Sequence, residues 1–238
     1  MDIHWPDYLW TVLFFAAGAW IVGRFLFQPR RIAQFPAFFG YAIWQIGSAA
    51  AVWGLYWAQV PWLYSFNRVV QVLTLATVTA VLIEIYFVLK RRADWSHWIA
   101  LLVFTLAAAV LARGPMAGYD YYYGLITVFM LFNCALAVMV QLMRLRSRRV
   151  SLGRSYSRIL FGLSLMLAFQ TFLYVYGLLD LTPWPWLVAL AQPISLAGWP
   201  WYIAALQRVE LPARLDLAEE EEELELSLVN PPGSVVAK

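Results

Sequence analysis

Cysteine, histidine and lysine are scarce in this chain, and their scarcity excludes several kinds of site. The single cysteine among 238 residues, Cys134, cannot form a disulfide within the chain. The two histidines, His4 and His97, lie far apart in the topology derived below, so a histidine pair for haem or a metal ion is missing. Neither lysine, Lys90 nor Lys238, lies in the last apolar segment, where a retinal protein needs one. We therefore predict no metal and no retinal.

Sequence signatures of catalysis are also missing. The chain contains no HExxH zinc motif, no phosphate-binding P-loop and no Rossmann glycine fingerprint. Its apolar segments hold no aspartate pair of the kind that an intramembrane protease would use. These absences favour a non-catalytic protein, and we expect no nucleic-acid partner.

Charged residues make up only 13% of the chain, whereas 63% of the residues are hydrophobic. Soluble domains contain about 25% charged and about 45–50% apolar residues, so this composition predicts a protein surrounded by lipid. The acidic start of the chain, with Asp2 and Asp7, lacks the positive region of a secretory signal. Because the first apolar run continues to Phe27, we expect an uncleaved first helix.

Seven apolar segments are candidates to cross a membrane as helices, which takes about 20 residues. They are residues 5–27, 36–58, 68–90, 97–112, 122–143, 157–181 and 185–206. The shortest is the fourth, which could extend through Arg113 if that side chain snorkels to the interface. The runs are too long and too continuous for the strands of a membrane barrel. The predicted fold is therefore an all-α, polytopic seven-transmembrane-helix bundle over residues 1–209, followed by an acidic cytoplasmic tail over residues 210–238.

Arginine and lysine are divided unequally between the two sides of this predicted bundle. Fifteen of the 17 basic residues fall in alternate connections and the tail, whereas only Arg68 and Arg113 fall on the other side. Short loops rich in basic residues remain in the cytoplasm. The predicted N-terminus is thus outside the cytoplasm and the C-terminus inside.

Glu84 is the clearest ionisable residue within a predicted span, about 9 Å inside the cytoplasmic end of the third span. Ionisable residues are costly in lipid and are therefore candidates for a functional site. Thr77 lies two turns earlier on the same helix face. Glu84 could provide a proton or cation site or anchor a ligand. The alternative is a structural ion pair of Glu84 with Arg24 or Arg91.

Other polar side chains fall within the spans and complete this candidate intramembrane site. They are Gln45, Gln170, Gln192 and Ser195, together with Asn133. They would form a polar pocket only if their helices converge. The alternative is that each side chain bonds to a neighbouring helix, which is the common use of such groups in membranes.

Small residues and prolines indicate how the helices pack. Gly47 and Gly54 form a small-residue stripe on the second span, and Gly23 continues a similar stripe on the first. Such stripes are typical of close helix contacts. Pro193 and Pro200 lie in the last predicted span, where each could kink the helix.

Two charged segments predict contacts outside the membrane core. The loop after the fifth span contains Arg144, Arg146, Arg148 and Arg149. It could contact anionic lipid headgroups or dock an acidic partner. The tail contains a run of glutamates that includes Glu219, Glu220 and Glu221. Such blocks of like charge are usually interaction tails.

Three short motifs carry a resemblance to other sequences. They are Gln34-Phe35-Pro36-Ala37-Phe38-Phe39-Gly40-Tyr41, Glu84-Ile85-Tyr86 and Trp199-Pro200-Trp201-Tyr202. With these motifs the chain resembles a group of uncharacterised seven-helix integral membrane proteins of the acidobacterial type, over most of residues 5–210. The resemblance implies an N-out bundle in the bacterial cytoplasmic (inner) membrane and no activity or site residue.

Three functions are compatible with these features. The first is a non-catalytic integral membrane subunit or scaffold of a bacterial membrane complex, whose acidic tail docks a protein partner or joins a homo-oligomer. The second is a seven-helix sensor or ligand-binding module, and the third is a small transporter or channel that uses Glu84. No cofactor is evident, although the aromatic span ends could bind a lipid, quinone or pigment instead of serving only as interfacial belts.

Overall fold

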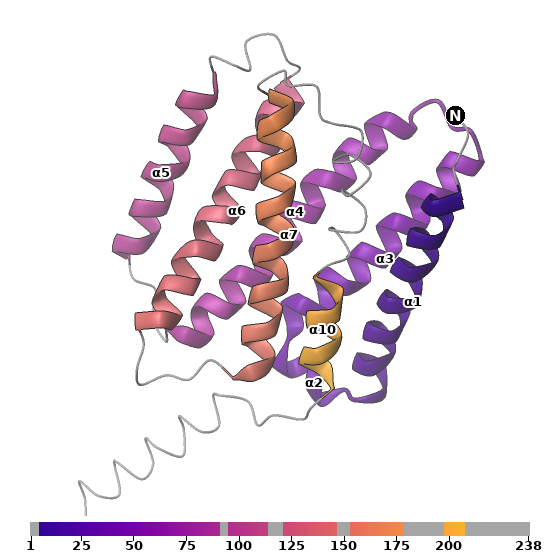
Figure 1. Cartoon of the computed structure of the whole chain (residues 1–238), viewed down its shortest axis with the longest axis horizontal. Coiled ribbons are helices and arrows are strands. Elements are labelled where there is room, and N and C mark those ends of the chain that lie inside the picture. The colour runs from indigo at the N-terminus through magenta and orange to yellow at the C-terminus, as the bar shows by residue number, and fades with distance from the viewer. Residues whose placement is uncertain (1–4, 91–94, 114–120, 147–152, 179–197, 208–238) are drawn as a thin grey trace, which may run out of the picture.

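The computed structural model describes residues 5–90, 95–113, 121–146, 153–178 and 198–207, and this part of the chain consists of eight helices without a strand. The helices are α1 (Trp5–Phe27), α2 (Arg30–Gln34), α3 (Pro36–Trp57), α4 (Leu63–Leu89), α5 (Trp95–Arg113), α6 (Tyr121–Arg146), α7 (Arg154–Leu178) and α10 (Trp199–Leu206). Figure 1 shows them side by side in one bundle. The predicted all-α fold is confirmed.

The long helices coincide with the predicted apolar segments. α1, α3, α4, α5, α6 and α7 overlap the first six of those segments, and α10 covers the end of the seventh, 185–206. The remainder of that segment lies outside the described residues. Two stretches of the described chain, Leu63–Leu89 and Gly124–Arg146, are long and apolar enough to cross a membrane by length and composition. The seven crossings remain a prediction.

Successive long helices alternate in direction, which brings the basic helix ends together. The C-terminal ends of α1, α4, α6 and α10 and the N-terminal ends of α3, α5 and α7 lie at the same end of the bundle (Figure 1). Basic residues of these ends and of α2 are Arg24, Arg30, Arg31, Lys90, Arg144, Arg146, Arg154 and Arg158. We call this end the basic end of the bundle.

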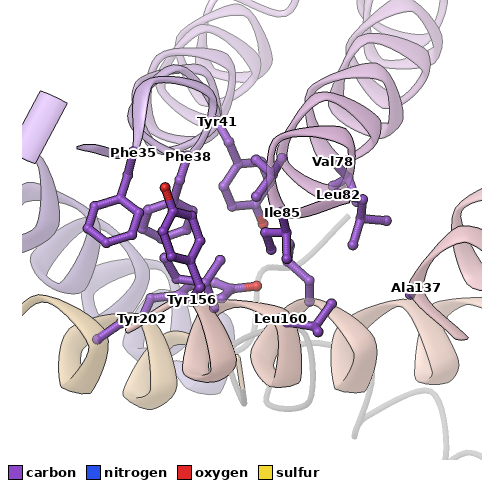
Figure 2. Close-up of a cluster of buried hydrophobic side chains, with 14 of the residues drawn as sticks. Phe35, Phe38, Tyr41, Val78, Leu82, Ile85, Ala137, Tyr156, Leu160 and Tyr202 are labelled. Atoms are coloured by element: carbon purple, nitrogen blue, oxygen red, sulfur yellow. The ribbon is translucent and has the colours of Figure 1, made fainter. Parts of the chain in front are cut away.

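The core is centred on α4, which packs against α3, α6 and α7. Ile85 and Tyr86 of α4 are fully buried, as are Leu160 of α7 and, nearly so, Phe38 of α3 and Tyr202 of α10. Figure 2 shows that side chains from α3, α4, α7 and α10 meet in one cluster near the start of α3. Apolar packing therefore continues to the basic end, where the polar contacts described below also lie.

α7 and α10 approach each other closely at a pair of glycines. A Cβ added at Gly162 would lie 2.6 Å from Cε1 of Tyr202 and 2.9 Å from the carbonyl oxygen of Gly198. A Cβ at Gly198 would lie 2.9 Å from the carbonyl oxygen of Gly162. Two glycines thus face each other, and the space that a side chain would need is filled by the backbone and the Tyr202 ring.

The predicted packing roles of Gly23, Gly47 and Gly54 are wrong in the described structure. A Cβ added at any of these positions would meet nothing within 4 Å. The physical reason is that small residues are equally acceptable on a lipid-facing surface, so a stripe alone does not identify the buried face. Pro200 also differs from the prediction, since it lies in the first turn of α10, where a missing backbone donor breaks no helical hydrogen bond.

α5 exposes many of its apolar side chains among the described residues. It packs mainly on α6 and forms one edge of the bundle in Figure 1. Six large apolar side chains on it are each more than half exposed, namely Trp95, Ile99, Leu102, Val103, Phe104 and Leu106. A helix that is apolar on nearly every face is normally buried in protein or surrounded by lipid.

Candidate functional site

Glu84 lies near the end of α4, and its side chain reaches the start of α3. Oε2 of Glu84 accepts the backbone N–H of Ala37 at 2.6 Å. α3 needs an acceptor here, because the first N–H groups of a helix have no partner within that helix and Phe35, the N-cap residue, has no polar side chain. A carboxylate at this position also interacts favourably with the helix dipole. Glu84 therefore caps the start of α3, although Ala37 is 47 positions away from it in the sequence.

Tyr156 of α7 joins the same corner. Its hydroxyl donates to the carbonyl oxygen of Gln34, the last residue of α2, at 2.5 Å. The hydroxyl also lies 3.4 Å from Oε1 of Glu84. Its ring packs against Phe35 with ring centroids 4.6 Å apart, a contact that can be followed in Figure 2. Tyr156 therefore holds α7 against the connection between α2 and α3.

The last turn of α10 is capped by side chains from other helices. The final carbonyls of any helix lack partners within that helix. Here they accept hydrogen bonds from Nη1 of Arg158 to Ala204 at 2.6 Å, from Oγ of Ser155 to Ala205 at 2.7 Å and from Nη1 of Arg31 to Leu206. We call Arg31, Glu84, Ser155, Tyr156 and Arg158 the capping cluster.

Arg31 is the buried charge of this cluster, since only 6% of its surface is exposed. Burial lowers the pKa of its guanidinium, and the nearby positive charge of Arg24 lowers this pKa further. The carbonyl end of α10 opposes both effects, because a helix C-terminus carries partial negative charge. Arg31 therefore serves as a cation placed on a helix C-terminus.

The two basic residues predicted to pair with Glu84 have different outcomes. The guanidinium of Arg24 lies over the ring of Trp20, with Cζ 5.0 Å from the ring centroid. Arg91 lies outside the described residues. The contacts of Glu84 given above involve a backbone N–H and a tyrosine hydroxyl, which are structural roles. The hypothesis of a proton, cation or ligand site at Glu84 stays a prediction.

Thr77 and two of the predicted glutamines, Gln45 and Gln170, lie within the described helices. The Thr77 hydroxyl donates to the carbonyl of Thr74 within α4 at 2.8 Å. Gln45 of α3 and Gln170 of α7 are both half-buried and lie further along their helices. Gln192 and Ser195 lie outside the described residues. Convergence of these side chains therefore stays untested.

Asn133 is fully buried between α6 and α4. Its Oδ1 accepts the Thr79 hydroxyl at 2.9 Å, and its Nδ2 donates to the carbonyls of Leu75 at 3.3 Å and Phe129 at 3.0 Å. The side chain uses its hydrogen-bonding groups on its own helix and on α4. Of the two interpretations of the buried amides, Asn133 fits the one in which the amide joins neighbouring helices.

We expect this contact to have a measurable but modest coupling energy. Thr79→Val, Asn133→Leu and the double substitution keep the side-chain sizes nearly constant. A double-mutant cycle of unfolding free energies in detergent should give a coupling of about 0.6 kcal/mol, and not above about 1.7 kcal/mol. Additive effects of the two substitutions would show that the Thr79–Asn133 bond contributes nothing.

A groove of about 730 Å³ lies at the basic end between α5, α6 and the end of α4. Its walls are apolar, and Lys90, His97 and Arg146 contribute the polar part of its lining. Arg144 lies on the same last turn of α6 but bonds to Gln141 at 3.5 Å and does not line the groove. This hollow was not foreseen from the sequence.

The other predicted contact residues cannot be placed. Arg148 and Arg149 and the glutamates Glu219, Glu220 and Glu221 lie outside the described residues. Among the residues that are described, no group of three or more His, Cys, Asp or Glu side chains could hold a metal ion. The capping cluster and the groove are therefore the two candidate sites that the geometry offers.

Comparison with protein families, with curated proteins and with solved structures gives no match. The resemblance to acidobacterial-type membrane proteins accordingly stays a prediction.

Proposed function

We propose that the chain is a non-catalytic integral membrane subunit or scaffold, built as a seven-helix bundle in the inner membrane of a bacterium with the N-terminus outside. The exposed apolar surface of α5 supports a lipid environment, since contact of so much apolar surface with water would be strongly unfavourable. The collection of basic helix ends at one end of the bundle supports a cytoplasmic assignment for that end.

The capping cluster is the observation that carries the scaffold interpretation. Three of its donors hold the last carbonyls of α10, directly before the segment that begins at residue 208. The remaining members join α2, α3, α4 and α7 at the same end. Polar groups that could have formed a reactive site are used to hold helix ends. The protein would thus present its acidic tail from a fixed position.

A pull-down from the native membrane in mild detergent tests this function. We expect the tagged full-length chain to recover a stoichiometric protein partner, and deletion of residues 208–238 to abolish the recovery. Replacing the glutamates at 219–223 with glutamine keeps the length of the tail. It should also weaken binding of the partner, because the proposed attraction is electrostatic. Arg68→Gln, a charge change near the start of α4 and so at the opposite end of the bundle, serves as the control and should leave recovery unchanged.

The opposite outcome is equally definite. A chain that is recovered alone, or only with copies of itself, whether or not the tail is present, would contradict the subunit proposal.

A second candidate function, a sensor or ligand-binding module, is favoured by the apolar groove at the basic end. A transporter or channel that uses Glu84 is the least supported, because the described contacts of this carboxylate are made with groups that hold helices together.

A further inference from the structure

The groove between α5 and α6 has the length of a lipid chain. Its lining on α6 runs from Leu131 to Arg146, and 15 residues of helix extend about 22 Å. One leaflet of a membrane core is about 15 Å thick. On the α5 side the lining runs from His97 to Phe104. Along α6 the groove is therefore at least as long as one leaflet, and it reaches the basic end.

The wall of the groove is shaped by one face of α6. Residues Leu131, Ala135, Val138, Leu142 and Arg146 recur every three or four positions, which places them along one side of the helix. Ala100 of α5 and Ala135 of α6 are small and leave space between the two helices. All but the last of these side chains are apolar, as an acyl chain requires.

The part of the groove that lies at the basic end is positively charged. Lys90, the C-cap residue of α4, and Arg146, the last residue of α6, both line it. α5 begins at Trp95 beside them, and His97 of its first turn also lines the groove. The backbone N–H groups of a first helical turn favour an anion. Two cations and a helix N-terminus thus converge where an apolar groove ends.

We propose that this groove binds one anionic phospholipid, with an acyl chain along α6 and the phosphate between Lys90 and Arg146. The inference rests on the proposed membrane location and not on the scaffold function. An apolar tail attached to a negatively charged headgroup complements both parts of the groove. A zwitterionic lipid would satisfy the apolar wall but would gain much less from the two cations.

Native mass spectrometry of the purified protein tests the proposal. The protein is mixed in detergent with phosphatidylglycerol and phosphatidylcholine of identical acyl chains. The wild-type chain should retain phosphatidylglycerol preferentially. Lys90→Gln/Arg146→Gln should reduce that preference roughly 25-fold, since each basic residue near a membrane surface contributes about fivefold. Arg30→Gln/Arg154→Gln removes two exposed cations of the same end that do not line the groove and should leave the preference within about twofold.

A second pair of variants tests the apolar part without changing charge. Ala100→Phe fills the groove and should lower retention of phosphatidylglycerol about tenfold. Ala107→Phe adds the same ring to an exposed position of α5 outside the groove and should not lower it. Size-exclusion profiles of all variants identify any that misfold, and Ala135→Leu replaces Ala100→Phe if the latter does.

Several outcomes would overturn the proposal. They are a wild type without preference, a control double variant that loses the preference equally, or displacement of the bound lipid by soluble glycerol phosphate at equal concentration. The last result would assign the cations to a free anion and leave the groove without a role. The lipid assay needs no protein partner, so it tests the groove independently of the scaffold function. If the chain is recovered alone in the pull-down but retains phosphatidylglycerol, the scaffold function is contradicted and the lipid site is supported.

Discussion

Gly162→Ala is expected to cost about 3 kcal/mol of unfolding free energy, the largest effect of any single substitution considered for this chain. The new Cβ would lie 2.6 Å from Cε1 of Tyr202 and 2.9 Å from the carbonyl oxygen of Gly198. Tyr202 cannot withdraw easily, because its ring also packs edge-on against Phe38 at 5.2 Å and Tyr41 at 6.2 Å. Relief therefore requires α10 to move away from α7.

The matched control is Gly47→Ala on α3, where an added Cβ meets nothing within 4 Å. Alanine has the higher helix propensity, by about 1 kcal/mol, so this variant should be neutral or slightly more stable than the wild type. Reversible unfolding in mixed detergent micelles, followed by tryptophan fluorescence, measures both. If the two variants unfold at the same denaturant concentration, the close packing of α7 on α10 has no energetic importance.

The contrast between these glycines shows where the sequence is informative. Helix positions could be predicted, because an apolar run of about 20 residues with turn signals at its ends has few alternatives. The buried face of each helix could not. Many exposed side chains of this bundle are as apolar as those of its core, so Gly47 and Gly162 have similar sequence surroundings but opposite environments.

The candidate sites were predictable only in part. Glu84 attracts attention because a carboxylate inside an apolar helix is unusual. Its contact with the N–H of Ala37 depends on how α3 and α4 pack, and no sequence pattern in either segment predicts it. Arg31 presents the same difficulty, since a basic residue in a short connection is ordinarily a topology signal. The groove depends on how α5 lies against α6, and no local pattern encodes that placement.

Glu84→Ala is the second substitution with a large expected effect. It removes the acceptor for Ala37 N–H and the group that faces the Tyr156 hydroxyl, and it leaves a cavity beside the start of α3. Loss of a helix N-cap costs about 1–2 kcal/mol, and a half-buried glutamate also contributes packing through its methylene groups. We expect a total loss of about 2 kcal/mol in the detergent unfolding assay.

Glu84→Gln separates the structural role of this side chain from a chemical one. Glutamine keeps an acceptor oxygen for the Ala37 N–H, so most of the stability should remain, with a loss near 0.5–1 kcal/mol for the missing charge at the helix N-terminus. If Glu84 only caps α3, the glutamine variant should retain its partner and its lipid while the alanine variant is destabilised. A glutamine variant that folds normally but stops cation or proton flux across liposomes would instead establish the carboxylate as part of a transport site. The order of the two variants in stability, with alanine below glutamine, is the direct consequence of the 2.6 Å contact.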